Sequence, residues 1–531
     1  MRHFSIDHQG RSAPATCLHM KRLALLLATG ASALVCAAQE PADALRFSYG
    51  VPAGTARQQA IGGAMGSLGG DFSALYGNPA GLGFYRTNDF VITPMFRWSE
   101  TKGSFLGRTE KESDRKFDVG ALGLVFGSPG KVGSLRGVGF SVGFSNTADF
   151  RNTILYRGQN NSSSYSQRFI EELGRAGVRD STAAYLFPYG PSLAINTFWL
   201  DPVKDANGQV TGFRSNSPVS TGLLQQQRVE SRGGINEAAL GIGLNTNDKL
   251  FVGATIGIPF LAYNRKATFT EADATTDTSN RFDFAEFRER VQTTGTGLNL
   301  KLGIIYKPAE YWRLGLAVHT PTLYKLTDRY HYELTTNTEN YEGEWDDFSK
   351  DYNDGAEHQF KYMLLTPLKA TASASYVLRE IEDVTKQRGF LTADVEYVAY
   401  NMMRYMPDND VENSEDTKAY LDYLNRNIRD LYKGAFNVRV GGELKFTTLM
   451  VRAGAAWYGN PYKEVNGGTG GRLNLTGGLG YRHRGYFIDL TYVHSMQRDI
   501  HTPYRLSDAP YFVAETRRTQ GNVALSFGVK F

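Results

Sequence analysis

The side chains best suited to chemistry in this sequence are its histidines and one serine beside a histidine. His494 and Ser495 are adjacent in the run YVHSMQ and could serve as the base and nucleophile of a lipase. Neighbouring residues of a strand point to opposite faces, so the two cannot readily share the hydrogen bond that activates a serine. The histidines after residue 38 lack metal-ligand spacing and are expected to be solvated or interfacial: His319, His331, His358, His483, His494 and His501.

Glycine-rich and acidic runs predict no cofactor site either. The run GGAMGSLGG at 62–70 has no strand before it and no βαβ unit after it, both of which a phosphate loop needs. Residues 341–358 and 407–416 are rich in carboxylates, but neither run has the spacing of a calcium loop. We therefore expect solvated outer loops there, and a protein with no enzyme activity, no cofactor and no metal.

The N-terminal region predicts export. Residues 20–38, MKRLALLLATGASALVCAA, have the basic start, apolar stretch and small-residue end of a Sec-type signal peptide, with Met20 as the favoured start of translation. Both cysteines, Cys17 and Cys36, lie within 1–38, so the exported chain is expected to be free of thiols, as suits an oxidising periplasm. A lipoprotein role for Cys36 is disfavoured, because Val35 stands where a small residue is needed.

The net charge and the hydropathy of the sequence argue against a nucleic-acid-binding protein and against a helical membrane protein. Residues 1–38 carry a net charge of +3 out of +4, which leaves the exported chain near +1 and without a basic stripe for nucleic acid. No later run approaches the 18 apolar residues of a membrane helix. A high content of glycine (57 residues) and of aromatic side chains (12%) instead points to β structure.

Strand-like segments alternate apolar and polar residues. In 435–446, AFNVRVGGELKF, Phe436, Val438 and Leu444 fall on one face and Arg439 and Glu443 on the other. The fold class predicted is all-β: a transmembrane antiparallel β-barrel of about 14 strands with an N-terminal hatch in its lumen. The expected strands lie near 89–99, 116–127, 136–147, 235–245, 250–270, 290–307, 311–335, 357–378, 388–401, 434–446, 449–458, 471–483, 485–497 and 519–531.

Loop lengths favour a membrane barrel over a soluble sandwich. Short turns alternate with long polar connections, notably 148–234, 336–356 and 402–433, and this asymmetry is typical of outer-membrane barrels. Two stretches within these loops predict amphipathic helices, 164–177 and 417–434, whose apolar faces could line a ligand pocket or pack onto the barrel mouth. The domain prediction is a pre-sequence and signal peptide at 1–38, a hatch at 39–88 and the barrel at 89–531.

Aromatic residues near strand ends predict the two interfacial girdles of such a barrel. They are Trp98, Trp312, Tyr397, Trp457, Tyr458, Tyr481 and Tyr486.

Residues 50–84 are rich in Gly and Ala and precede the first expected strand. A barrel of 14 strands encloses more space than its side chains fill, so a compact segment is needed to plug it. The block GTARQQAIGGAMGSLGGDFSALYGNPAGLG resembles the N-terminal hatch of the FadL/TodX-like outer-membrane transport family. The resemblance is carried by the signature Asn78, Pro79 and Ala80 and by the preceding stretch Asp71, Phe72, Ser73 and Ala74. The residues expected to act in the hatch or in gating are Asp71, Ser73, Asn78, Pro79, Ala80 and Gly81.

That resemblance implies a channel in which the hatch and strand irregularities let a hydrophobic ligand pass from an outer pocket toward a lateral opening. The alternation itself predicts paired charges that line the lumen: Lys301, Asp394, Glu396, Arg439, Glu443, Lys445, Arg452 and Asp489.

The predicted function is passive uptake of hydrophobic small molecules, such as long-chain fatty acids, across the outer membrane of a Gram-negative bacterium. The expected partners are outer-membrane lipid, a hydrophobic ligand and, during biogenesis, the barrel assembly machinery, with no nucleic acid. The alternative is a surface adhesion or structural barrel in which the segment 148–234 binds a partner and the pore stays closed.

Overall fold

The computed structural model describes residues 41–50, 54–378, 388–410, 414–463 and 470–531. The predicted signal peptide at 1–38 lies outside these residues. No helix within them is long and apolar enough to cross a membrane.

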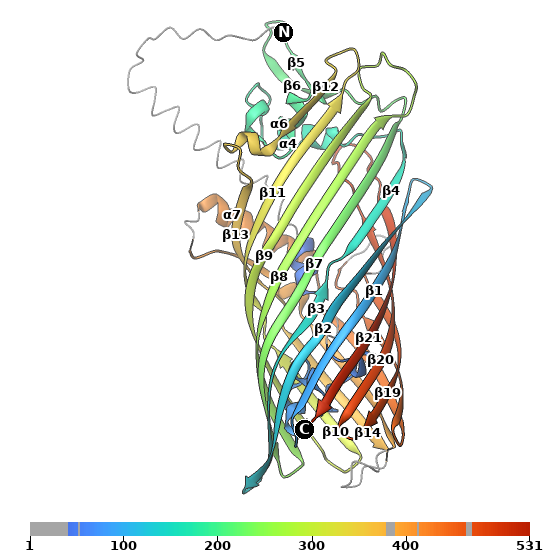
Figure 1. Cartoon of the computed structure of the whole chain (residues 1–531). Helices are drawn as coiled ribbons and strands as arrows, with labels where there is room; N and C mark the ends of the chain where they lie inside the picture. Colours follow the sequence, from blue (N-terminus) through green and yellow to red (C-terminus); the bar gives the residue numbers. More distant parts are fainter. Residues whose placement is uncertain (1–40, 51–53, 379–387, 411–413, 464–469) are drawn as a thin grey trace.

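The described strands form a closed antiparallel barrel with fourteen strand positions, since β3 with β4, β10 with β11 and β13 with β14 each form one interrupted strand (Figure 1). The last strand pairs with the first and closes the wall. The wall comprises β1 (Asp89–Phe105), β2 (Arg108–Val132), β3 (Leu135–Asp149), β4 (Asn152–Asn160), β7 (Leu223–Thr246), β8 (Leu250–Asp273), β9 (Phe284–Tyr306), β10 (Trp312–His319), β11 (Leu323–Asn337), β13 (His358–Leu365), β14 (Lys369–Leu378), β15 (Gly389–Val398), β17 (Ala435–Phe446), β18 (Leu449–Tyr458), β19 (Arg472–His483), β20 (Tyr486–His501) and β21 (Ala514–Lys530).

Alternation along these strands separates an apolar outer face from a polar inner one, as predicted. On β17, Leu444 is 52% exposed while the preceding Glu443 is 8% exposed. Phe436, Val438 and Val440 also lie on the outer face. Apolar side chains exposed in a continuous band are stable only against lipid, so this belt marks the part of the wall that crosses the membrane.

Two segments predicted as single strands are interrupted. The segment 311–335 divides into β10 and β11, and 357–378 divides into β13 and β14. Pro321 and Pro367 lie at the two breaks, and proline supplies no N–H to a strand ladder. The two interrupted strands stay paired across the breaks in one register: β10 lies beside β14, and β11 lies beside β13.

The three segments predicted as outer loops contain regular structure. Residues 148–234 include β4, the first half of β7, helices α4 (Ser166–Arg175), α5 (Ala183–Leu186) and α6 (Pro191–Asn196), and a hairpin of β5 (Leu200–Lys204) and β6 (Val210–Ser215). Residues 336–356 include β12 (Glu344–Phe348) and η3 (Ser349–Tyr352). Residues 402–433 include β16 (Arg404–Pro407) and α7 (Glu415–Leu431), after η5 (Tyr400–Met402). The strands in these segments are polar, so their composition does not predict them. Pairing with other strands of the folded protein stabilises them.

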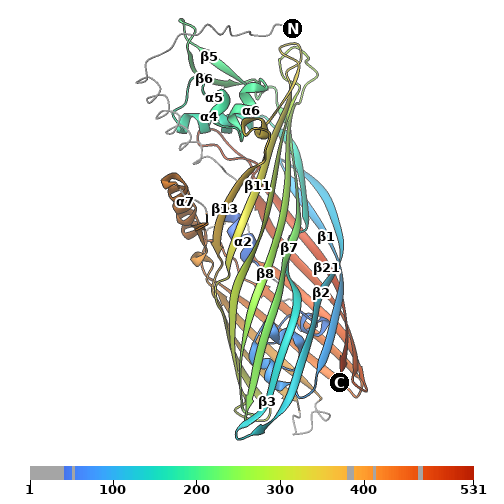
Figure 2. The ribbon, with the colours of Figure 1, turned by 60° about the vertical axis from the view of Figure 1, so that its left-hand side comes forward.

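Both predicted amphipathic helices are confirmed, as α4 and α7. The apolar face of α7 packs toward the barrel mouth through Tyr420, Leu421, Leu424 and Ile428, whereas Leu431 is exposed. Figure 2 shows α7 alongside the upper barrel.

The predicted girdle is wrong at one residue. Trp98, Trp312, Tyr397, Trp457, Tyr481 and Tyr486 are exposed on the outer face. Tyr458 is buried on the inner face, with the Arg472 guanidinium 4.1 Å from its ring centroid. Adjacent aromatic residues of one strand, here Trp457 and Tyr458, necessarily point to opposite faces.

Candidate functional site

Three short helical turns lie inside the lower barrel and form the hatch, the segment predicted at 39–88 (Figure 2). They are α3 (Ala56–Ala60), η1 (Phe72–Leu75) and η2 (Pro79–Phe84). Each begins after a residue whose side chain accepts a backbone N–H: Thr55, Asp71 and Asn78 respectively. These residue types satisfy the free N–H groups at a helix start, and Pro79 fits the first turn because it has no N–H to satisfy.

Asp71 joins two parts of the hatch. Its carboxylate accepts hydrogen bonds from Thr55 Oγ1 (2.9 Å) and from the Ser73 backbone N–H (3.0 Å) and hydroxyl (2.5 Å). Arg57 approaches it to 3.9 Å. Burial alone would raise the pKa of Asp71, but the Arg57 charge and the bonds from Ser73 and Thr55 outweigh it and lower the pKa below its usual value.

Asn78 connects the hatch to the barrel wall. Its Oδ1 accepts from the Ala80 N–H (3.1 Å), while its amide N–H groups donate to the carbonyls of Gly66 (2.6 Å) and, on β9, Ile304 (3.2 Å). The Leu316 carbonyl on β10 lies 3.4 Å from the same nitrogen. The wall leaves room for this approach, because a Cβ on Gly303 would overlap the Asn78 side chain.

The neighbouring hatch residues are also close-packed. A Cβ on Gly253 of β8 would overlap the Pro79 backbone, and Ala80 is buried beside Phe251 and Ile305. Gly81 donates its N–H to the Asn78 carbonyl (3.0 Å). Asn78, Pro79, Ala80 and Gly81 thus form one compact turn packed against β8, β9 and β10.

Side chains of the wall bond the hatch from several sides. Asp394 accepts from the Gly66 N–H (3.2 Å) and from the Ser373 hydroxyl (2.5 Å). His319 Nε2 lies 2.6 Å from the Gly77 carbonyl, and Arg313 donates to the Leu68 carbonyl (2.7 Å). His319 was expected to be solvated or interfacial, which the structure corrects, since it faces the lumen from β10.

Most of the predicted lumen charges form ion pairs on the inner face. Arg439 donates to Glu396 (2.5 Å), and Lys301 pairs with Glu237 of β7. Glu237 was missed, although the alternation in 235–245 would have placed it inward. Seven of the predicted lumen residues, Lys301, Asp394, Glu396, Arg439, Glu443, Arg452 and Asp489, are wholly or largely buried.

One charged chain extends from the wall into the hatch. Arg452 donates to Glu443 (2.6 Å) and to Asp489 (2.5 Å), and Glu443 also accepts from Arg57 of α3 (3.3 Å). Because Arg57 also faces Asp71, this chain links three wall strands to α3 and to the start of η1. Sequence reasoning missed Arg57, whose signal was a lone basic residue in a Gly/Ala-rich block.

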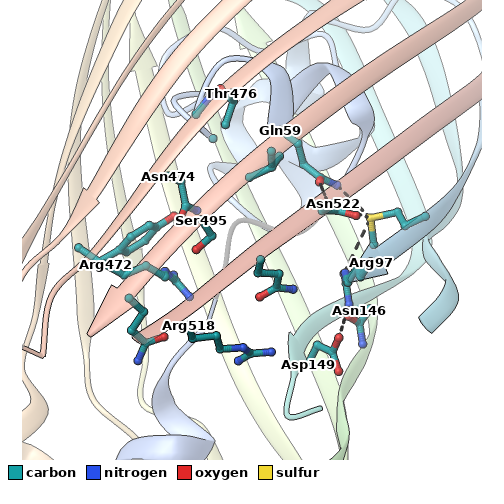
Figure 3. A pocket seen from close by; sticks show the side chains of 17 residues that line it. Gln59, Arg97, Asn146, Asp149, Arg472, Asn474, Thr476, Ser495, Arg518 and Asn522 are labelled. Carbon is teal, nitrogen blue, oxygen red and sulfur yellow. Dashed lines mark hydrogen bonds and ion pairs between the residues drawn. The ribbon is translucent and has the colours of Figure 1, made fainter. Parts of the chain in front are cut away.

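Two cavities flank the hatch, and their linings include many polar side chains. One, of about 110 Å³, lies among β1, β19, β20, β21 and the hatch, and Figure 3 shows its side chains converging. Arg97 there donates to Asn146 (2.8 Å) and to Asp149 (3.3 Å) of β3. Ser495 also lines this cavity, whereas His494 contacts Tyr492 on the outer face, so the two side chains point apart. The other cavity, of about 180 Å³, lies between the hatch and α2 (Pro41–Ser48).

The wall is interrupted beside the first cavity. Pairing of β2 with β3 ends at Ala121 and Ser145, and above that level β4 pairs with β7 and not with β2. Instead β4 passes the inner side of β1, where Thr101 donates to Asn152 (2.8 Å) and the rings of Phe105 and Tyr156 lie 5.2 Å apart. The wall between β2 and β4 therefore lacks ladder hydrogen bonds.

Above the hatch, α2 occupies an apolar space that we call the outer apolar cluster. Phe47 of α2 contacts the rings of Phe150 and Tyr263 at centroid distances of 5.7 and 5.6 Å. The cluster comprises Ala44, Leu45, Phe47, Ala148, Phe150, Ile235, Leu261, Tyr263, Tyr324, Leu326, Tyr362, Leu364, Val398, Tyr400, Met403, Tyr405, Tyr420, Leu421, Leu424, Ile428, Tyr432 and Ala435.

Comparison with solved structures defines the class of fold. A FadL homologue of Pseudomonas aeruginosa superposes with a TM-score of 0.53 at 14% sequence identity, covering 91% of this chain and 100% of the homologue. The toluene transporters TodX of P. putida and TbuX of Ralstonia pickettii give TM-scores of 0.49 and 0.46, each at 14% identity, with 91% of this chain and 99% of theirs covered. No protein-family model and no curated protein matches the sequence.

The chain thus has the fold of a FadL-type barrel. The resemblance to the FadL/TodX-like family that the hatch block predicted is therefore confirmed at the level of the fold.

Proposed function

We propose that this protein is an outer-membrane channel for the passive uptake of hydrophobic small molecules such as long-chain fatty acids. The observation that carries the proposal is the missing strand ladder between β2 and β4, beside the first cavity and above the hatch. A hydrophobic molecule gains nothing by crossing to the aqueous side, whereas passage between β2 and β4 gives it direct access to lipid. The fold that this chain shares with the FadL homologue of P. aeruginosa supports the same function.

The outer apolar cluster is the proposed entry site. It lies on the long-loop side and is lined by aromatic and aliphatic side chains, which suits a hydrophobic ligand. Because α2 fills it through Phe47, ligand entry requires α2 to move. The predicted gating residues Asp71, Ser73, Asn78, Pro79, Ala80 and Gly81 then determine whether the lumen below stays shut.

A ligand that passes between β2 and β4 has to displace β4 from its contacts with β1, so the lateral route can be tested by tying β4 to β1. In a chain truncated to the predicted thiol-free form, Thr101→Cys and Asn152→Cys place two thiols where the native side chains lie 2.8 Å apart. Oxidation is expected to abolish uptake of labelled fatty acid into liposomes, and reduction to restore it. The matched control is Ser104→Cys with Thr109→Cys, a pair 2.8 Å apart within the β1–β2 hairpin, which should leave uptake unchanged.

Uptake at the wild-type rate by the oxidised Thr101/Asn152 pair would contradict the lateral route. Absence of uptake by the unmodified protein would favour the adhesion or structural role instead.

A further inference from the structure

Four basic residues stand directly opposite one another on the outer face of neighbouring strands. Lys111 of β2 pairs with Lys102 of β1, Lys102 pairs with Arg517 of β21, and Arg517 pairs with Arg498 of β20. Directly opposite residues of an antiparallel ladder share one face, with Cβ atoms about 5 Å apart. All four residues are exposed, and Figure 1 shows β1, β21 and β20 side by side. We call these four residues the basic row.

Such a row is unfavourable in the protein by itself, because like charges directly opposite on a sheet repel. Glu100 offsets part of it, at 3.6 Å from Lys102 and 3.8 Å from Lys111. Within the part of the chain that the structure describes, no carboxylate forms an ion pair with Arg498 or Arg517. The basic row therefore keeps an excess of positive charge that the barrel does not neutralise.

The outer face of β7, β8 and β9, which follow β2 beyond β3 and β4 in the wall, is built differently. There the outward row on β7, β8 and β9 reads Glu230, Lys266 and Arg290, so a carboxylate stands within the row. Glu230 is further held by Arg228 at 2.7 Å. The uncompensated charge is thus a local property of the β20–β21–β1–β2 face.

The basic row lies just beyond the apolar belt on the long-loop side. The stacked rings of Trp98 and Tyr492, 5.9 Å apart, are exposed near the edge of the belt. Lys102 follows Trp98 by four residues, and Arg498 follows the exposed Met496 by two. At about 3.4 Å per residue along strands tilted by about 40°, these positions lie roughly 5–10 Å above the belt. That is the level of lipid headgroups, which long basic side chains reach readily.

We propose that the basic row binds the phosphate groups of a phosphorylated glycolipid of the outer leaflet, the lipid A part of lipopolysaccharide. The guanidinium groups of Arg498 and Arg517 can each donate two hydrogen bonds to a phosphate, and the ammonium groups of the two lysines attract it electrostatically. The row spans three inter-strand spacings, about 14 Å, which accommodates more than one phosphate. Arg115, exposed on β2 and paired with Trp98, extends the site toward the belt. The proposal assumes the outer-membrane location but not the transport of a ligand.

The test is a thermal-unfolding titration of the purified full-length barrel with bisphosphorylated lipid A in detergent. The variant Lys102→Gln/Arg517→Gln is compared with the wild type and with Lys266→Gln/Arg290→Gln, which removes the same charge from the mixed row. Wild type and control should show the same rise in Tm. The basic-row variant should need roughly 25-fold more lipid A for that rise, at about fivefold per basic residue.

A second readout separates lipid binding from a structural role. Without lipid A, the basic-row variant should unfold at the wild-type temperature or above it, because the substitution relieves repulsion. Inorganic phosphate, dephosphorylated lipid A and phosphatidylglycerol should each leave the wild-type Tm nearly unchanged. Equal lipid A responses in all three proteins, a lower lipid-free Tm of the variant, or an equal response to inorganic phosphate would each overturn the proposal. Uptake in liposomes that lack lipid A should be the same for all three proteins, so a failure of the transport proposal is detected separately.

Discussion

Asn78→Asp tests most directly how the hatch is held in the lumen. The substitution keeps the Oδ1 acceptor that caps η2 but removes the amide hydrogens that reach Gly66 and the β9 wall. It also places a carboxylate oxygen against carbonyl oxygens in a buried site. Because the change is isosteric, packing against Gly303 is preserved.

The expected magnitude follows from the lost bonds. Two amide hydrogens make two full hydrogen bonds, together worth about 2 kcal/mol, and leaving the buried acceptors unpaired costs at least about 1 kcal/mol more. The sum of about 3 kcal/mol corresponds to a shift of roughly 150-fold toward the released hatch.

Single-channel recording in planar bilayers measures this shift. The variant should show about two orders of magnitude more open events than the wild type, while its heat-modifiable mobility on a gel confirms a folded barrel. Asn247→Asp, in an exposed short turn, is the control and should behave as wild type. A folded Asn78→Asp barrel with wild-type conductance and wild-type uptake would refute the role of Asn78 in holding the hatch.

Three further predictions concern the hatch and the outer wall. Gly303→Ala should raise basal conductance, because the new Cβ displaces the Asn78 side chain; Gly477→Ala, where the nearest atom is 3.8 Å away, should not. Leu424→Ala on α7 should lose about 2–4 kcal/mol of packing and speed proteolysis of the 414–433 segment, whereas the exposed Tyr423→Ala should leave digestion unchanged. Since the folded pKa of Asp71 lies below its ordinary value of 3.8, its stabilisation of the hatch is present above about pH 4 and is lost as the pH falls through that lower pKa. Conductance should therefore stay low from pH 7 to 5 and rise only in stronger acid; a rise already at pH 5 would contradict this assignment.

Local sequence was sufficient to predict which face of a strand meets lipid. Residues 435–446 alternate with a period of two, and burial in the structure follows that period. The two amphipathic helices were predicted for the same reason, because their apolar spacing is local. Caps such as Asn78 and the following Pro79 likewise act on the next two or three residues, so the turn that they start was readable from the sequence.

Some structural features that were not predicted could have been read from neighbouring residues in the sequence. Pro321 and Pro367 marked the interruptions of two strands, and the alternation around Glu237 placed it on the inner face. The inner position of Tyr458 followed from the outer position of Trp457.

Nothing in the local sequence predicted which residues contact each other across the lumen. Arg57 and Glu443 are separated by 386 residues, and Asn78 and Ile304 by 226. The basic row depends in the same way on the registers of four strands, of which β1 and β21 are the first and last of the barrel.

The sequence by itself determined the two-residue period of each strand, the caps of the hatch turns and the positions of the apolar residues. The tertiary structure alone decided which strands pair at each height, that β4 turns inward past β1, and which charges face each other across the lumen. The physical reason is that side-chain direction repeats every two residues along one strand, whereas strand register is set by hydrogen bonds between segments far apart in the chain.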